Sequence, residues 1–152
     1  MKKVIFFVFI CIFSSHTAVS QKPVEFYFSH GGFNIGQRSI HLIKNENSIT
    51  ATFNPWQRIE EYSVTVEIEE VFFNSFFEEL DPLNIPKWKN KYVNSSILDG
   101  YEWNLKIRFD NNQKEKETYG VNDYPKDWDK FIKIIFKYFP QMSFNYYEFK
   151  PS

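Results

Sequence analysis

The chain has a single cysteine, and its position decides what that cysteine can do. Cys11 lies within the first twenty residues, a stretch with the anatomy of a secretory signal peptide. A lipid anchor on Cys11 is disfavoured by the bulky Ile10 before it. We therefore expect a mature chain, residues 21–152, without cysteine. Disulfides, on which many small exported domains depend, and thiolate catalysis are then excluded. The mature domain has to be held together by its core alone.

Long apolar runs are missing beyond that first stretch. Lys2 and Lys3 supply positive charge, Val4–Phe13 is an apolar run of ten residues, and Ala18 and Ser20 mark a small-residue cleavage site. A membrane anchor is the alternative, but a helix needs about 20 apolar residues to cross the bilayer. We expect residues 1–20 to be a signal peptide, the protein to be periplasmic or extracellular, and the mature chain to have no membrane span.

An excess of positive charge is also missing. The chain carries 18 Lys and Arg against 19 Asp and Glu. Loss of Lys2 and Lys3 leaves 16 basic and 19 acidic residues, a formal mature charge of −3. Binding to nucleic acid depends on a basic surface that neutralises phosphates, and binding to anionic lipid depends on a polybasic segment. We therefore expect no nucleic-acid partner.

Motifs for metals, cofactors and nucleophilic catalysis are missing as well. The mature chain has two histidines, His30 and His41, without the clustering that a zinc site requires. There is no G-x-S-x-G elbow, and the glycine-rich segment 29–36 lacks the ending of a phosphate-binding loop. We expect no cofactor, no metal and no catalytic residue.

Carboxylates are plentiful, and they leave one catalytic alternative open. A glycosidase needs two of them across a cleft, about 5–5.5 Å or about 6.5–9.5 Å apart. Most of those in this chain fall on the polar side of an expected strand or helix, where a solvated face explains them. The residues concerned are Glu60, Glu61, Glu67, Glu69, Glu70, Glu78, Glu79 and Asp81.

Aromatic side chains are abundant: 18 Phe, 9 Tyr and 4 Trp. They bury more area per residue than other side chains, and a chain of this size can bury enough surface for one self-sufficient domain. The sequence has no internal repeat, no low-complexity segment and no linker long enough to separate two domains. We expect a single domain over residues 21–152.

The alternation of apolar and polar residues predicts the strands. Segment 29–36 is expected to be a loop, and 45–47 and 110–113 are expected to be hairpin turns. The segment 143–149 is expected to be either a late edge strand or a loose tail. The predicted strands are Val24–Phe28, Arg38–Lys44, Ser48–Phe53, Glu61–Glu67, Tyr101–Phe109 and Lys114–Val121.

Apolar residues at three- and four-residue spacing predict two helices. Asp81–Pro82 ends the first and Pro140 ends the second. Together with the strands they indicate an α+β domain, an antiparallel sheet of about five to six strands with two helices packed on one face. The expected stripes are Ile68, Val71, Phe72, Phe76, Leu80 and Leu83 in the first helix, and Trp128, Phe131, Ile132, Ile135, Phe136 and Phe139 in the second.

A distinctive pattern covers the C-terminal part of the chain. It consists of D-G-x-x-W-x-L-x-I at 99–107 and G-x-N-x-Y-P at 120–125, followed by Trp128. This pattern resembles a signature that recurs in small uncharacterised bacterial exported proteins. No activity is assigned to that group, so the resemblance implies a unit of the fold and no reaction.

Most residues of this pattern have a structural explanation. Gly120 would allow a positive φ or a bulge, and Asn122 or Asp123 would bond backbone amides on the approach to the helix. Trp128 is expected to pack against Trp103.

A functional alternative exists for the same corner. Tyr124 and Pro125 would fix the angle at which the chain enters the helix, but Asn122, Tyr124 and the Asp99–Gly100 turn could instead line a rim that contacts a ligand. Several aromatic residues outside the periodic stripes, among them Tyr27, could also form an exposed platform. The candidate partner surface is Trp56, Trp88, Asn122, Tyr124, Tyr146 and Tyr147.

Three functions are compatible with these features. The favoured one is an exported domain that binds a protein or glycan without catalysing a reaction. The second is a small exported hydrolase that acts on glycan or cell-wall material through paired carboxylates. The third is an inhibitor or immunity-type protein, which differs from the first only in its partner.

Overall fold

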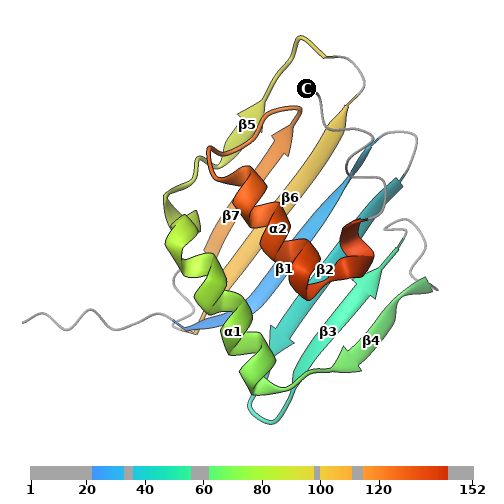
Figure 1. The fold of residues 1–152 in the computed structure, drawn as a ribbon, viewed down its shortest axis with the longest axis vertical. Coiled ribbons are helices and arrows are strands. Elements are labelled where there is room, and N and C mark those ends of the chain that lie inside the picture. Colours follow the sequence, from blue (N-terminus) through green and yellow to red (C-terminus); the bar gives the residue numbers. More distant parts are fainter. Residues whose placement is uncertain (1–21, 33–35, 56–61, 98–99, 111–114, 144–152) are drawn as a thin grey trace, which may run out of the picture.

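The computed structural model describes residues 22–32, 36–55, 62–97, 100–110 and 115–143, which form one twisted sheet with two helices on one of its faces (Figure 1). The order of the strands across the sheet is β4-β3-β2-β1-β6-β7-β5. Their bounds are β1 Pro23–Gly32, β2 Gly36–Lys44, β3 Ile49–Asn54, β4 Val64–Glu67, β5 Lys91–Val93, β6 Tyr101–Phe109 and β7 Glu115–Val121.

The α+β class is confirmed, but the described residues contain seven strands where about five to six were expected. The additional strand is β5, which the periodicity did not indicate. It pairs with β7 in parallel, while every other neighbouring pair is antiparallel. A strand of three residues has too little alternation to be recognised, and a sequence without a crossover helix gives no sign of a parallel partner.

The first strand is longer than expected. The predicted loop 29–36 is wrong at its described residues, because β1 continues through His30 to Gly32, pairing with both β2 and β6, and β2 begins at Gly36; 33–35 lie outside the described residues. Ser29 and His30 are buried in this strand although both are polar. Polar residues in a central strand hide the alternation on which the prediction depended.

The two helices lie where they were predicted. Helix α1 spans Glu70–Leu80 and helix α2 spans Trp128–Tyr138, and short 3₁₀ turns follow them. The buried face of α1 is Phe73, Phe76 and Leu80, so Val71 does not belong to the stripe: its side chain is 66% exposed. The 3₁₀ turns are η2 Asp81–Leu83, η3 Ile85–Lys87 and η4 Pro140–Ser143.

The part of the sheet under α2 is closely packed. Trp103 of β6 and Trp128 of α2 have ring centroids 4.6 Å apart, which confirms the expected contact. Gly120 is needed there for a reason other than the expected one. Its φ is not positive, but a Cβ built on it would lie 2.1 Å from Nε1 of Trp103. The glycine therefore makes room for the indole.

The corner before α2 depends on Asn122, which has a positive φ of 52°. Its Oδ1 accepts a hydrogen bond from the backbone N–H of Tyr101 at 2.8 Å, while Oδ1 of Asp123 accepts one from the N–H of Tyr124 at 2.9 Å. Asp123 bonds a backbone amide on the approach to the helix, as expected, whereas Asn122 bonds the amide at the start of β6. Pro125 precedes the helix by a turn, since the N–H of Trp128 donates to its carbonyl at 3.0 Å.

The 3₁₀ turn η4 is attached to the sheet through its main chain. His30 Nε2 lies 2.8 Å from the carbonyl oxygen of Met142, and Arg38 Nη1 donates to the carbonyl oxygen of Gln141 at 2.8 Å. Two strands thus hold the last described turn by its carbonyl groups. Within the described ranges, no helix is both long enough and apolar enough to span a bilayer.

Candidate functional site

Of the candidate partner surface, only Trp88, Asn122 and Tyr124 are among the residues that the structure describes. Trp56, Tyr146 and Tyr147 lie outside them. Trp88 belongs to the core: it is 9% exposed, its Nε1 donates to the carbonyl of Leu83 at 3.2 Å, and its ring packs edge-on against Phe131. A buried indole with a satisfied N–H offers little to a ligand.

Asn122 and Tyr124 come together at one end of the sheet. Tyr124 is half-buried between Tyr101 and Trp128, with ring centroids 6.1 and 5.1 Å away. Burial, and then the charge of Asp123, raise the pKa of Tyr124 to about 12. The amide nitrogen Nδ2 of Asn122 is buried without a hydrogen-bond partner. These contacts fix a corner of the fold, and Asp99, the remaining residue of the expected rim, lies outside the described residues.

The two histidines point to opposite faces of the sheet. His30 lies on the helix-covered face, stacked on Phe28, and its Nδ1 is 2.5 Å from the hydroxyl of Tyr101. Since Nε2 faces a carbonyl oxygen, the network assigns the proton to Nε2 and makes Nδ1 the acceptor of the Tyr101 hydroxyl. Burial lowers the pKa of His30 to about 4.

His41 lies on the other face of the sheet and has a different environment. Its Nε2 is 2.9 Å from Oε1 of Glu25, whose second oxygen accepts from Nε of Arg108 at 2.7 Å. Burial works against ionisation of Glu25, but hydrogen bonds from Arg108 and His41 lower its pKa. The two histidines therefore have no common site, and no group of metal-binding side chains is found in the described part of the chain.

The carboxylates considered for catalysis are mostly solvated. Glu60 and Glu61 lie outside the described residues. Glu79 pairs with Lys137 and with the hydroxyl of Tyr138, and both interactions lower its pKa. The exposed ones are Glu67, Glu69, Glu70, Glu78 and Asp81.

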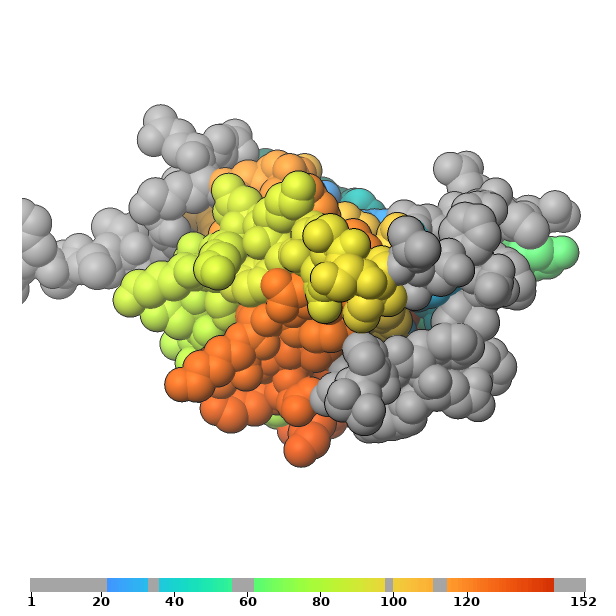
Figure 2. Space-filling view, turned by 90° about the horizontal axis from the view of Figure 1, so that it is seen from above, coloured from blue at the N-terminus to red at the C-terminus, as the bar shows by residue number. Residues whose placement is uncertain are grey.

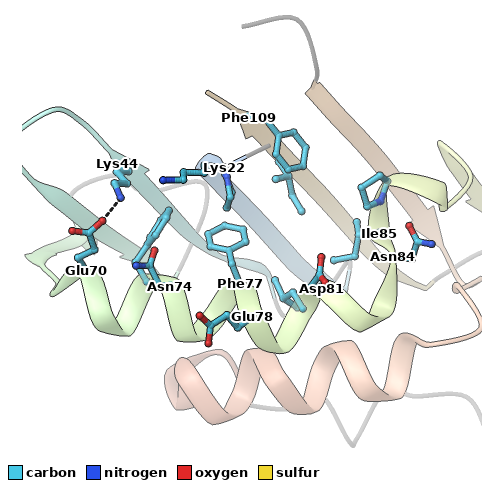
Figure 3. Close-up of a pocket in the computed structure, with 15 residues that line it drawn as sticks. Lys22, Lys44, Glu70, Asn74, Phe77, Glu78, Asp81, Asn84, Ile85 and Phe109 are labelled. Carbon is cyan, nitrogen blue, oxygen red and sulfur yellow. Dashed lines mark hydrogen bonds and ion pairs between the residues drawn. The ribbon is translucent and has the colours of Figure 1, made fainter. Parts of the chain in front are cut away.

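A groove lies between α1 and the adjacent end of the sheet, and we call it the α1 groove (Figure 3). Its volume is about 570 Å³. Figure 3 shows Phe77 projecting from α1 towards the sheet and Phe109 at the end of β6, on the other side of the hollow. Both rings are half-buried, while Phe73 and Ile107 beside them are buried. The groove thus has an aromatic and aliphatic floor.

The rim of the α1 groove carries charges of both signs. Lys44 Nζ lies 2.5 Å from Oε1 of Glu70 and 5.7 Å from the ring centre of Phe73. The hydrogen bond and charge of Lys44 lower the pKa of Glu70. Lys22 lies on the same side of the groove, and Asp81 lies at the far end of α1 (Figure 3).

The Lys44–Glu70 pair also borders a second hollow. This hollow has a volume of about 390 Å³ and lies around the turn between β2 and β3. Lys44 and Glu70 line both hollows, so this ion pair separates them.

Sequence reasoning missed the α1 groove because it took the helical stripe as the only informative face. One signal was present. Phe77 directly follows the core residue Phe76, and an aromatic residue one position off a buried stripe lies at the border of the core. That signal identifies a half-buried ring, but the hollow beside it depends on how far the helix stands from the sheet.

Comparison with known proteins adds no assignment. No family model matches the chain, and no curated protein is significantly similar to it.

Proposed function

We propose that the protein is an exported domain that works by binding, without catalysis, and that its α1 groove receives a peptide segment of a protein partner. The observation that carries the proposal is the pair of half-buried rings, Phe77 and Phe109, beside a hollow of about 570 Å³. Peptide grooves combine an apolar floor for an anchor side chain with a polar rim for the rest of the ligand.

The floor of the groove favours an apolar or aromatic anchor. Filling it would remove the exposed parts of both rings from water, which stabilises a complex by about 25 cal/mol per Å² of apolar surface before the costs of association are counted. The rim favours a peptide because it carries Lys22 on one side and the carboxylate of Asp81 on another. A charged segment can therefore pair at either end of the anchor.

The groove is less suited to binding a flat glycan. Sugar binding by stacking needs an exposed aromatic face, and the floor rings here are half-buried. The hydrolase alternative also has weaker support in the groove. A general acid needs a carboxyl with a raised pKa, and Lys44 lowers that of Glu70. An inhibitor or immunity-type role stays compatible, because it requires the same groove with an enzyme as the partner.

The proposal is tested by selecting ligands without assuming their identity. A random peptide library displayed on phage is panned against the purified protein, and the affinity of selected peptides is measured by calorimetry. We expect peptides with an aromatic or large aliphatic anchor, whose affinity falls about tenfold or more in Phe77→Ser and Phe109→Ser, as for loss of a central anchor contact.

Tyr119→Ser is the matched control. Tyr119 is an exposed aromatic residue of β7, 40% exposed, on the face of the sheet opposite the helices. The Tyr119→Ser variant should bind the selected peptides with unchanged affinity. Selected peptides that bind both groove variants as tightly as the original protein would contradict the proposal, as would a library that yields no binder.

A further inference from the structure

The two edges of the sheet differ in how far they are protected. At one edge, β5 has three residues, and Lys89 and Lys91 hold their ammonium groups 5.9 and 5.8 Å from the ring centres of Tyr92 and Tyr119. Short edge strands with lysines resist pairing with another chain. At the other edge, all four residues of β4 are exposed. Among the described residues, no strand pairs with the outer side of β4.

The backbone of β4 offers hydrogen bonds on that outer side. Ile68 N–H donates to the carbonyl of Ile49 at 2.9 Å, and the register pairs Val66 with Ala51. In an antiparallel pair, bonded residues alternate with residues whose N–H and C=O point away. Ile68, Val66 and Val64 therefore bond β3, while the N–H and C=O groups of Thr65 and Glu67 point outwards.

The side chains along this edge are apolar on one face. Val64 and Val66 are 59% and 51% exposed, and they lie on the same face as their partners Phe53 and Ala51, the face that the helices cover elsewhere. Tyr62, just before the strand, is 56% exposed, and Val71 at the start of α1 is 66% exposed. The green atoms of this edge project at one extreme of the molecule in Figure 2.

We infer that the outer edge of β4 pairs with β4 of a second copy of this chain, antiparallel, with Thr65 on the two-fold axis. In this register Thr65 faces Thr65 of the second copy and exchanges both backbone bonds with it, and Glu67 faces Ser63. Val64 faces Val66 in the closely spaced, non-bonded position, twice across the axis. Cross-strand pairs of β-branched residues are stabilising there.

The charge pattern disfavours one register and suits a second copy of the chain as the occupant. Moving the axis to Glu67, the other residue of β4 with outward groups, would place two carboxylates opposite each other, which is unfavourable. With Thr65 on the axis, no residue of β4 faces a like charge. A second copy presents this same complementary strand by symmetry, as an isologous interface requires.

The pairing has a geometric consequence. Directly opposite residues of an antiparallel pair lie on the same face, so the sheet continues across the axis and the helices of both copies cover the same face. The two α1 grooves then lie on the same face of the dimer, at opposite ends of the continuous sheet.

The test uses reciprocal charges at Thr65. The mass of the purified protein is measured by light scattering and sedimentation over a range of concentrations. We expect a dimer that becomes monomeric in Thr65→Lys and in Thr65→Asp, because each places like charges on the axis. Mixing the two variants should restore a dimer that contains one of each. The hydroxyl of Thr65 bonds that of Thr52 at 2.9 Å, and both variants lose this bond equally.

Two further variants serve as controls. Thr65→Pro removes an N–H that points away from β3, so it should block the dimer while the thermal unfolding of the monomer persists. Val93→Lys makes the matched change on β5 and should leave the dimer intact. A monomeric original protein, a dimer that survives Thr65→Pro, or a Lys and Asp mixture that stays monomeric would each overturn the inference.

Discussion

The two helices cover the same face of the sheet, but they meet it in opposite ways. Under α2 the contact is closed: Trp128 lies against Trp103, and Gly120 has no side chain because the indole occupies the space. Under α1 the contact is incomplete, and a hollow bordered by Phe77 and Phe109 is left at the end of the sheet. Both regions are built from aromatic residues. The difference therefore lies in how completely the rings are packed, and we expect the closed region to determine stability and the open one to determine binding.

The largest expected effect compares one phenylalanine from each region. Phe131 is fully buried, with ring centroids of Phe28 and Trp128 at 5.0 and 5.4 Å. Phe131→Ala should lower the free energy of unfolding by about 3–5 kcal/mol. Phe77 is half-buried, so Phe77→Ala should cost about 1 kcal/mol. Urea denaturation measures both, and similar losses would remove the distinction between the two regions.

The next effect is a pH dependence that belongs to the closed region. The pKa of His30 is about 4 in the folded protein against its ordinary 6.5. Between these values the unfolded chain binds a proton that the folded one does not. The free energy of unfolding therefore increases as the pH rises through this window and decreases as the pH falls through it. The full contribution is at most about 3.5 kcal/mol, at about 1.4 kcal/mol per pH unit.

The control for this pH dependence is His30→Phe. Losing the bond to Met142 should lower the stability of this variant at all pH values, but its free energy of unfolding should change less between pH 4 and 6.5. Denaturation measured at several pH values gives both slopes. Equal slopes for the two proteins would show that other groups cause the dependence.

A smaller effect probes the fit of Gly120. A methyl group there would lie 2.1 Å from Nε1 of Trp103, which also donates to the carbonyl of Asp123 at 3.0 Å and cannot easily move. Gly120→Ala should therefore cost about 2 kcal/mol through overpacking. In the background Trp103→Phe the same change should cost clearly less, because the smaller ring leaves room. Additive losses in this double-mutant cycle would contradict the explanation.

The smallest effect concerns the ion pair at the open region. Lys44 lowers the pKa of Glu70, so Lys44→Gln should raise that pKa towards its ordinary value, with little change in stability because exposed ion pairs contribute little. NMR titration of the Glu70 side chain measures this pKa in both proteins. Lys130→Gln, at a different exposed pair on α2, is the control and should leave Glu70 unchanged.

The closed region was largely predictable from the sequence, and the reason is periodicity. The strict alternation in Tyr101–Phe109 predicted β6 with its observed bounds, and the spacing of Trp128 and Phe131 predicted the buried face of α2. Strong periodicity fixes which side chains face the core, so the contact between Trp103 and Trp128 followed from it.

The open region was not predictable, because its properties depend on tertiary packing. Trp88 lies off every periodic stripe, so periodicity gave it no face and it was named as a candidate for the partner surface. In the structure it follows the 3₁₀ turn Ile85–Lys87, and its ring packs against Phe131 of the closed region. The hollow beside Phe77 is the volume that α1 leaves unfilled. Local sequence patterns specify the faces of elements, but they do not specify the distance between them.

The attachment of η4 has a consequence for how the sequence can change. His30 and Arg38 hold this turn by the carbonyl groups of Met142 and Gln141, atoms that every amino acid possesses. The exposed side chain at position 141 is therefore open to substitution without loosening the turn, whereas the two donors in β1 and β2 are not. Divergent versions of this protein should vary at position 141 and keep His30 and Arg38, whose side chains bond the carbonyl groups of the turn.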